Sequence, residues 1–204
     1  MNARARQTSA GQVREQILAA ASERFRQFGY NKTTMAEIAR DCAMSAANLY
    51  RYFDNKQAIA AALARACLDD MLQLLGGIVA RREESAAERL RELVLAILHY
   101  THREWSENPR MNEMVGEVCE ARGDIVEEVH LRERTLLCEL LRQGMVRGEF
   151  EVADVDATAS ALITATTLFR LPLLMQLYPL DVFEQRANEL VDVLLRGILK
   201  PQCP

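Results

Sequence analysis

The sequence predicts an all-α protein with two parts: an N-terminal three-helix bundle containing a helix-turn-helix, and a larger C-terminal helical domain. Half of the 204 residues are hydrophobic, which is enough for a core larger than a small bundle requires. Apolar residues recur at helical spacing in nearly every segment, and no alternating strand pattern stands out. We therefore expect the bundle over residues 11–57 and the second domain over residues 58–200.

The first predicted helix ends at a glycine. Glycine tolerates the left-handed conformation that closes a last helical turn, so Gly29 is a natural stop. Before it, apolar residues fall on one helical face: Val13, Ile17, Ala20, Ala21, Phe25 and Phe28. Arg4 and Arg6 lie further upstream in a polar tail, for which a solvated terminus and an arm that reaches for phosphate are both open interpretations.

Residues 33–56 read as two short helices joined by a tight turn. Thr34 is a good N-cap, and Glu37, three residues later, completes a capping box that starts a helix at about Met35. Ser45 caps the next helix. The first of these helices turns its apolar side chains towards a core: Met35, Ile38, Ala39 and Cys42. This layout is typical of a helix-turn-helix.

The second of these helices has one apolar face and one small, polar face. Leu49 and Phe53 lie four residues apart and point inward. At about 100° per residue, the centre of the outward face falls on Ala47 and Arg51. Such a face fits a major groove, where arginine pairs with guanine or a phosphate. Alanine methyls there either contact thymine methyl groups or simply allow the backbone to approach.

The pattern T-T-x-x-x-I-A, followed by S-x-x-x-L-Y-x-Y-F and x-x-K, is carried by Thr33, Thr34, Ile38, Ala39, Ser45, Leu49, Tyr50, Tyr52, Phe53 and Lys56. It resembles the N-terminal domain of TetR-family transcriptional regulators. The resemblance covers residues 11–57 and implies a DNA-binding domain in which the third helix is the recognition helix. Its implied DNA contacts are Thr34, Ser45, Ala46, Ala47, Asn48, Tyr50, Arg51, Tyr52 and Lys56.

One position departs from that resemblance. Many family members hold a glycine in the turn where this chain has Ala43. Alanine is disfavoured at positive φ, so the turn is expected either to be strained or to use a different dihedral angle.

The distribution of charge along the chain also favours DNA binding by the N-terminal part. Residues 1–56 carry nine lysines and arginines against five acidic residues, a local charge of +4, whereas the whole chain has a formal charge of -4. Phosphate binding needs local positive charge, and an acidic remainder discourages non-specific wrapping of DNA.

Caps, glycines and prolines divide the rest of the chain into further helices. We expect helix starts near Asn55, Ser85, Met111, Asp124, Asp154 or Asp156, and Pro179. We expect breaks or stops near Gly76–Gly77, Asn108–Pro109, Ala121, Gly148 and Pro172. The last two helices carry small and aliphatic residues on more than one side, which predicts a partner surface. The resemblance implies a homodimer that holds two recognition helices against one pseudopalindromic site on double-stranded DNA.

The resemblance also implies a ligand-binding core in the middle helices, for a small molecule that the sequence does not identify. Residues combining apolar bulk with isolated polar groups are the candidates: Met71, Leu74, Leu98, His102, Trp105, Met114, Glu117 and Phe169. Ordinary core packing is the competing interpretation for most of them. Glu113, Glu117 and Glu120 form an acidic row that faces either a pocket for a lipophilic cation or solvent.

Catalytic, metal and cofactor motifs are missing from the sequence. It has no glycine-rich phosphate loop, nucleophile elbow or HExxH, and His99 and His102 lack the partner carboxylates of a helical metal site. We expect no enzyme, no metal and no cofactor. No cysteine pair has CxxC spacing among Cys42, Cys67, Cys119, Cys138 and Cys203, and no apolar run approaches about 18 residues. A reduced, cytoplasmic protein without membrane contact fits best.

The sequence therefore predicts a sequence-specific DNA-binding transcriptional regulator, in the simplest version a dimeric repressor that a small-molecule ligand releases from its operator. Two alternatives stay open. One is a DNA-binding regulator without a ligand, and the other is a redox sensor that uses a cysteine such as Cys42.

Overall fold

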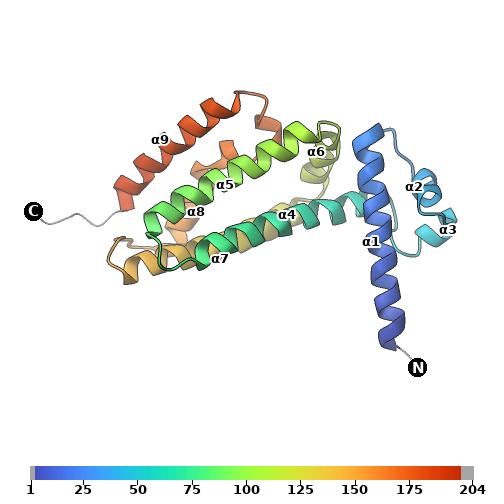
Figure 1. The fold of residues 1–204 in the computed structure, drawn as a ribbon, viewed down its shortest axis with the longest axis horizontal. Helices are drawn as coiled ribbons and strands as arrows, with labels where there is room; N and C mark the ends of the chain where they lie inside the picture. Colours follow the sequence, from blue (N-terminus) through green and yellow to red (C-terminus); the bar gives the residue numbers. More distant parts are fainter. Residues whose placement is uncertain (1–2, 199–204) are drawn as a thin grey trace, which may run out of the picture. The chain divides into compact units, whose positions relative to one another are not determined.

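The computed structural model describes the backbone of residues 3–198 and the side chains of residues 11–198. The side chains of Arg4 and Arg6, residue Cys203 and residues 199–200 of the predicted second domain lie outside this range. Between residues 3 and 198 the chain is helical without a β-strand, so the predicted all-α fold is confirmed. The elements are α1 (Ala3–Phe28), α2 (Met35–Asp41), α3 (Ala46–Leu49), α4 (Lys56–Ala80), α5 (Ala86–Glu107), α6 (Met111–Ala121), α7 (Gly123–Val146), α8 (Val155–Ala165), the 3-10 helices η1 (Thr167–Phe169) and η2 (Pro172–Leu174), and α9 (Leu180–Ile198) (Figure 1).

The chain forms two compact units. The first combines Met1–Cys67 with Asn108–Ile125, and the second combines Leu68–Glu107 with Val126–Pro204. The sequence placed a boundary between residues 57 and 58, which falls inside the first turn of α4. Because α4 is one continuous helix and α6 packs against α1, the first unit extends further along α4 and recruits α6. No helix in the described range is both long and apolar enough to cross a membrane.

The first unit buries the apolar faces that the sequence predicts for its first two helices. Ile17 and Phe25 of α1 and Ile38 of α2 are fully buried. Phe28 is an exception, because it is 46% exposed where a buried residue was expected. It lies at the last position of α1, and the Arg24 guanidinium covers its ring at 5.0 Å from the centroid. Gly29 follows at φ +88° and closes the helix as predicted.

The second unit packs α5, α7, α8, α9 and the second half of α4 around one apolar core. α5 and α9 lie side by side (Figure 1). To the core, α5 contributes Leu90, Leu93 and Ile97, and α9 contributes Phe183 and Val191. Each of these side chains is at most 1% exposed. Helical periodicity places such residues on one stripe, so the amphipathic patterns of α5 and α9 account for their contact.

The start of α8 agrees with the sequence, whereas its end does not. Asp154 is the N-cap, and its carboxylate accepts a backbone N–H at 2.9 Å. The helix was expected to continue to Pro172, but it ends at Ala165. Just beyond, the Thr166 hydroxyl donates to the Leu162 carbonyl at 2.8 Å. Hydroxyl groups that bond carbonyls four residues back bend helices, and the chain continues here as two short 3-10 helices.

Two helices are longer than expected. α1 begins at Ala3, because the upstream segment contains alanine, arginine and glutamine, which favour helices. α4 runs unbroken through Gly76 and Gly77, although a glycine pair was expected to loosen it. Neither glycine has a positive φ, and a Cβ built at either would meet nothing within 4 Å. The pair therefore lowers helix propensity without breaking the helix.

Candidate functional site

The helix-turn-helix starts with the capping box that the sequence predicts. The Thr34 hydroxyl accepts the Glu37 backbone N–H at 3.3 Å, and the Glu37 carboxylate accepts the Thr34 backbone N–H at 2.9 Å. A further hydrogen bond from the Thr34 hydroxyl is the main cause that holds the pKa of the Glu37 carboxyl below its usual value. The carboxylate also lies at the positive end of the helix dipole. The start of α2 is therefore fixed by local contacts.

The turn between α2 and α3 is a Schellman motif that closes on an alanine. Ala43 has φ +53°, and its N–H donates to the Arg40 carbonyl at 3.0 Å. The Met44 N–H donates to the Ala39 carbonyl at 2.9 Å, which completes the motif. An alanine in this conformation brings its Cβ close to the following carbonyl and costs about 1–2 kcal/mol. Of the two alternatives open for this turn, the strained one is observed.

α3, the expected recognition helix, is a single turn capped by Ser45. The Ser45 hydroxyl accepts the Asn48 N–H at 3.2 Å, as its capping role predicts. Leu49 is fully buried and fixes the inner face. The N–H groups of Arg51 and Tyr52 then reach carbonyls three residues back, at 3.2 and 2.9 Å. The chain therefore tightens to 3-10 geometry beyond α3, where the sequence indicated α-helical spacing.

The side chains expected to contact DNA differ in exposure. Five are exposed: Thr34, Ser45, Ala47, Tyr50 and Arg51. Four are partly buried: Ala46, Asn48, Tyr52 and Lys56. The exposed five offer hydroxyl groups, a methyl group, a phenol and a guanidinium, which are groups that donate to phosphate or contact base edges.

Two arginines of α1 hold the motif in place, and sequence reasoning missed both. Arg14 donates to the Tyr52 carbonyl at 2.5 Å, and its guanidinium lies 4.2 Å from the centroid of the Phe53 ring. Arg24 donates to Asp41 at 2.5 Å, and this hydrogen bond holds the pKa of the Asp41 carboxyl below its usual value. These partners are 38 and 17 residues away along the chain, so helical periodicity carries no signal for them.

Lys56 is engaged inside the first unit. Its ammonium donates to the Tyr30 carbonyl at 2.7 Å and to the Thr33 carbonyl at 3.0 Å, and it lies 4.1 Å from the centroid of the Tyr30 ring. Burial lowers the pKa of this ammonium, while the charges of Glu117 and Glu113 act in the opposite direction. Two of its three N–H donors therefore serve the loop between α1 and α2.

The acidic row of α6 is exposed, and its first member contacts the same loop. Glu113 accepts the Asn31 backbone N–H at 3.2 Å. Arg110, which precedes α6, donates to the Gln27 carbonyl near the end of α1. All three members of the row are exposed: Glu113, Glu117 and Glu120. Within the first unit, Glu113 serves the α1–α2 loop, and Glu113 and Glu117 favour the charge of Lys56. The row faces solvent, so a pocket for a cation is not supported.

The eight expected ligand residues divide between the two units. Two belong to the first unit, Met114 and Glu117, and the other six belong to the second. Three of those six are core residues at most 6% exposed: Met71, Leu98 and Phe169. His102 and Trp105 pack against each other at the end of α5, with ring centroids 5.7 Å apart. Met114 of the first unit is also buried, so core packing, the competing interpretation, describes half of the set.

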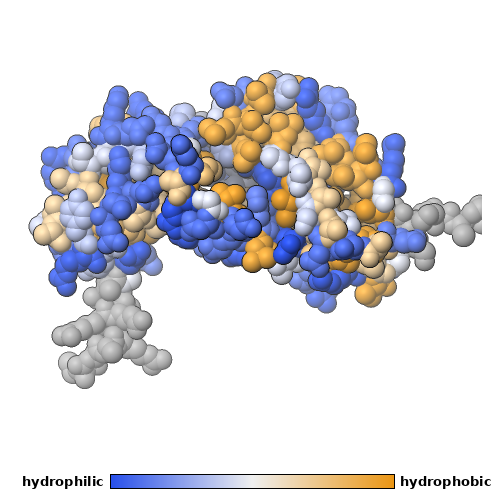
Figure 2. All heavy atoms as spheres, turned by 180° about the vertical axis from the view of Figure 1, so that it is seen from behind, coloured by the Kyte–Doolittle hydropathy of each residue, from blue (hydrophilic) through white to orange (hydrophobic). Residues whose placement is uncertain are grey.

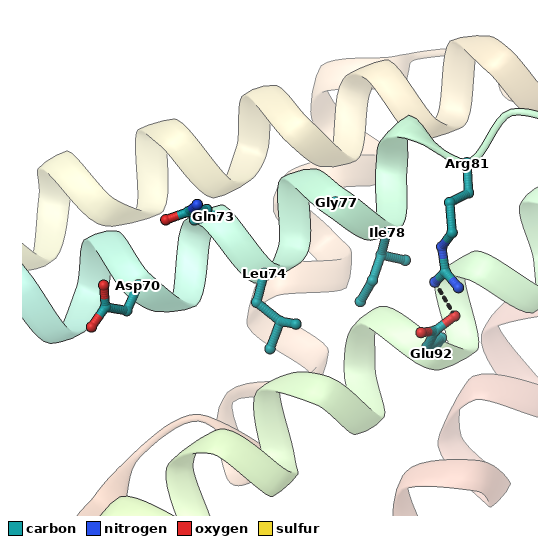
Figure 3. Close-up of a pocket in the computed structure, with 7 residues that line it drawn as sticks. All are labelled: Asp70, Gln73, Leu74, Gly77, Ile78, Arg81 and Glu92. Atoms are coloured by element: carbon teal, nitrogen blue, oxygen red, sulfur yellow. Dashed lines mark hydrogen bonds and ion pairs between the residues drawn. The ribbon is translucent and has the colours of Figure 1, made fainter.

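The remaining residue, Leu74, lines an open groove of about 460 Å³ beside α4. Leu74 and Ile78 point from α4 towards α5, and Arg81 pairs with Glu92 of α5 at the far end (Figure 3). Gly77 lies between them on α4, and the lining is completed by Asp70 and Gln73. The groove is a surface feature of the second unit, and it does not enclose a ligand.

Two of the described cysteines, Cys42 and Cys138, are buried and poorly suited to redox chemistry. Cys42 is 5% exposed, and burial raises the pKa of its thiol. Burial likewise raises the pKa of the Cys119 and Cys138 thiols. Oxidation proceeds through the thiolate, which a raised pKa disfavours. In the described part of the chain, no three His, Cys, Asp or Glu side chains are grouped to hold a metal ion.

Two regions of the chain match family profiles. Residues 17–63 match "Bacterial regulatory proteins, tetR family", and residues 86–191 match "Tetracyclin repressor-like, C-terminal domain". The second match alone spans more than half of the 204 residues.

Characterised relatives are similar over most of their length. The HTH-type transcriptional regulator UidR of Escherichia coli (strain K12) is 24% identical over 173 residues, which cover 79% of this chain and 81% of UidR. The probable HTH-type transcriptional regulator ArpR of Pseudomonas putida is 28% identical over 168 residues, which cover 75% of this chain and 76% of ArpR.

Solved structures share the fold. A TetR-family transcriptional regulator from Pectobacterium atrosepticum has a TM-score of 0.74 at 21% identity and covers 98% of this chain and 100% of its own. A putative TetR-family regulator from Mesorhizobium loti has the same TM-score at 15% identity, covering 94% of this chain and 98% of its own. With the helix-turn-helix described above, these matches show that the chain belongs to the tetR family of bacterial regulatory proteins and is a DNA-binding transcriptional regulator, not an enzyme.

Proposed function

We propose that this regulator is a homodimeric repressor that binds a pseudopalindromic operator and leaves it when a small molecule binds. Residues 11–57 then form the DNA-binding domain, and residues 58–200 form the regulatory and dimerisation domain. The observation that carries the proposal is the outer face of α3 and the residues after it, which is small at its start and bears the exposed groups of Tyr50 and Arg51. Arg14 and Arg24 of α1 bond to Tyr52 and to Asp41 on either side of it.

The side chains of α3 and of the residues that follow it have distinct roles in this proposal. Ala46 and Ala47 let the helix enter the major groove closely, and Arg51 reads a guanine or binds a phosphate. Tyr50, half of which is exposed, donates to the DNA backbone. Lys56 acts indirectly, because its ammonium holds the loop that leads into α2. The local charge of +4 over residues 1–56 attracts the phosphates.

A second copy is needed because one turn of helix contacts too few base pairs to specify an operator. The second unit offers surfaces for it. The outer side of α8 is lined by small residues: Ala157, Ala161 and Ala165. Large apolar side chains on α9 and on the segment before it are more than half exposed: Leu173, Leu177 and Val193. Figure 2 shows hydrophobic side chains gathered on this part of the molecule. Such a surface favours burial against an identical partner.

Release by a small molecule is supported by structures that share the fold. The flavonoid-responsive regulator FrrA has a TM-score of 0.66 at 21% identity, and SmeT, the repressor of the Stenotrophomonas maltophilia multidrug efflux pump SmeDEF, has a TM-score of 0.61 at 20% identity. Because this regulator binds DNA, we also place it in the cytoplasm.

Fluorescence anisotropy with labelled DNA from upstream of the protein's own gene tests the proposal. The expected result is saturable binding of two chains per site that weakens as salt rises, and a weaker preference for the operator with Arg51→Ala in a protein that still folds. Equal affinity for the upstream DNA and for a scrambled duplex of the same composition would contradict an operator-specific regulator. Binding of one chain per site would contradict the dimer.

A DNA-binding regulator without a ligand is the second candidate. It is favoured by the dense packing of the second unit, in which the enclosed cavity beside Arg170 measures only about 10 Å³. Screening small molecules for displacement of the labelled DNA separates the two candidates.

A further inference from the structure

The recognition segment, residues 46–53, is too short to hold its own shape. α3 contributes a single α-helical turn to it. The N–H groups of Arg51 and Tyr52 then donate to carbonyls three residues back, at 3.2 and 2.9 Å, so the chain continues in 3-10 geometry. Short 3-10 stretches have poorer hydrogen bonds than α-helices, and isolated helices of a few residues are unstable in water. The path of this backbone therefore depends on contacts from the rest of the first unit.

Two buried side chains hold the inner face of the recognition segment. Leu49 is fully buried, and Phe53 is 3% exposed. Tyr50 and Arg51 lie between them in the sequence and are exposed. Apolar contacts are not directional, so they fix the depth of the segment better than the direction of the exposed side chains. That direction requires a contact with defined geometry.

Arg14 of α1 supplies such a contact at the end of the segment. It donates to the Tyr52 carbonyl at 2.5 Å, and its guanidinium lies 4.2 Å from the centroid of the Phe53 ring. A hydrogen bond from a charged donor is stronger than one between neutral groups, and a planar guanidinium stacks on a ring while it bonds a carbonyl. Both partners directly follow Arg51, the residue expected to read a base.

Arg14 is carried by a helix that is itself anchored in the core. Ile17, Ala21 and Phe25 follow it at helical spacing on one stripe of α1, and all three are fully buried. Side chains on a packed helix are held more precisely than side chains on a loop. α1 therefore offers a fixed support from which Arg14 holds the Tyr52 carbonyl.

We propose that Arg14 is a positioning residue for base recognition, which sets the direction of the Arg51 side chain without contacting DNA itself. Its hydrogen bond fixes the backbone one residue beyond Arg51. An arginine that reads guanine aligns two N–H groups with the base edge, so a small rotation of its backbone weakens discrimination. The inference rests on the proposed function, in which Arg51 faces the operator.

A direct phosphate contact is the competing role for Arg14. The residue is exposed, and a guanidinium has five N–H donors, of which the bond to Tyr52 uses one. Removing a phosphate contact lowers affinity for every sequence and reduces the slope of log affinity against log salt by about one unit. Removing a positioning contact changes the preference between sequences and leaves that slope unchanged.

Arg14→Met separates the two roles, because it keeps an unbranched side chain and removes the donor. Fluorescence anisotropy measures its affinity for the operator and for single-base-pair operator variants at several salt concentrations. Discrimination at the position read by Arg51 is expected to fall about five- to tenfold, with an unchanged salt slope. The control is Arg26→Met, which removes the same charge from an exposed position in the last turn of α1 and is expected to keep the wild-type base preference. Equal base preference in the two variants, or a reduced salt slope in Arg14→Met alone, would overturn the inference.

A double-mutant cycle shows whether Arg14 acts through Arg51. If it does, Arg14→Met combined with Arg51→Ala discriminates at that position no worse than Arg51→Ala alone, because the side chain that Arg14 directs is already missing. Additive losses would contradict the inference. Thermal unfolding gives the folded fraction of each variant, and a lower folded fraction weakens binding to all sequences by the same factor without changing the base preference.

The wild-type protein separates this inference from the proposed function. If it binds the upstream DNA no better than scrambled DNA, the function is wrong and the inference falls with it. If it prefers its operator but Arg14→Met matches Arg26→Met, the function stands and the role of Arg14 is wrong. If Arg51→Ala lowers affinity equally for all operator variants, Arg51 does not read a base, and the positioning role fails while operator binding stands.

Discussion

Ala43→Gly is predicted to stabilise the protein. Ala43 is exposed, so its methyl group contributes no buried area, yet its φ of +53° is a conformation that favours glycine. The left-handed conformation costs an alanine about 1–2 kcal/mol. Glycine removes that cost and adds about 0.4–1 kcal/mol of conformational freedom to the unfolded chain. The difference leaves a net stabilisation of about 0.5–1 kcal/mol.

Thermal unfolding followed by circular dichroism measures this effect. For a chain of this length, about 1 kcal/mol corresponds to about 2–4 °C in Tm, so the expected rise is about 1–4 °C. The matched control is Ala66→Gly, an exposed position inside α4, where glycine is expected to lower the stability by about 0.5–1 kcal/mol. The same substitution thus has opposite signs at the two positions.

The hydrogen bonds of the turn are expected to survive in Ala43→Gly, because both donors and both carbonyls belong to the backbone. The orientation of α3, and with it operator affinity, is therefore expected to stay unchanged. A fall in Tm equal to that of Ala66→Gly would refute the reasoning, because it would mean that Ala43 does not occupy a positive φ.

Three further predictions concern the first unit. Lys56→Met is expected to lower stability by about 1–3 kcal/mol, because the Tyr30 carbonyl loses a charged donor. The salt dependence of operator binding is expected to stay unchanged, and a slope reduced by about one unit would instead assign Lys56 to a phosphate. Arg51→Ala is expected to relax the base preference at one operator position and to lower discrimination against the wrong base there by about 1–3 kcal/mol. A uniform loss of affinity across operator variants would instead indicate a phosphate contact. Asp41, whose pKa is lowered by Arg24, stabilises the folded state fully above its ordinary pKa of 3.8, and this contribution is lost as the pH falls through the lower folded value. In urea unfolding as a function of pH, Arg24→Met is expected to flatten that acid limb, and an unchanged limb would exclude the pair as its source.

The sequence predicted the helix-turn-helix well because its determining contacts are local. The capping box joins residues three positions apart, and the Ser45 cap reaches Asn48 across the same distance. Local contacts of this kind are encoded by residue type and spacing alone. The apolar stripe of α2 followed from periodicity for the same reason.

Contacts between distant residues escaped prediction. The ammonium of Lys56 bonds a carbonyl 26 residues away, and Arg14 bonds a carbonyl 38 residues away. Both residues are charged, so the sequence predicts that they are exposed to solvent or contact DNA. The residues next to them in the sequence do not indicate which carbonyl they bond. The sequence predicted that α8 would end at Pro172. The helix ends earlier, at Ala165, where the Thr166 hydroxyl donates to the Leu162 carbonyl.

The Glu133–Arg170 pair is the furthest from what a sequence can reveal, since its members lie 37 residues apart and join α7 to the segment after η1. Stability does not account for it. Burying two charges costs several kcal/mol in desolvation, and apolar residues of similar volume are often as stable or more stable in such a position. Within the described part of the protein, Glu133 Oε1 and Arg170 Nε have no hydrogen-bond partner. We therefore expect the pair to position the segment after η1 against α7 rather than to add stability.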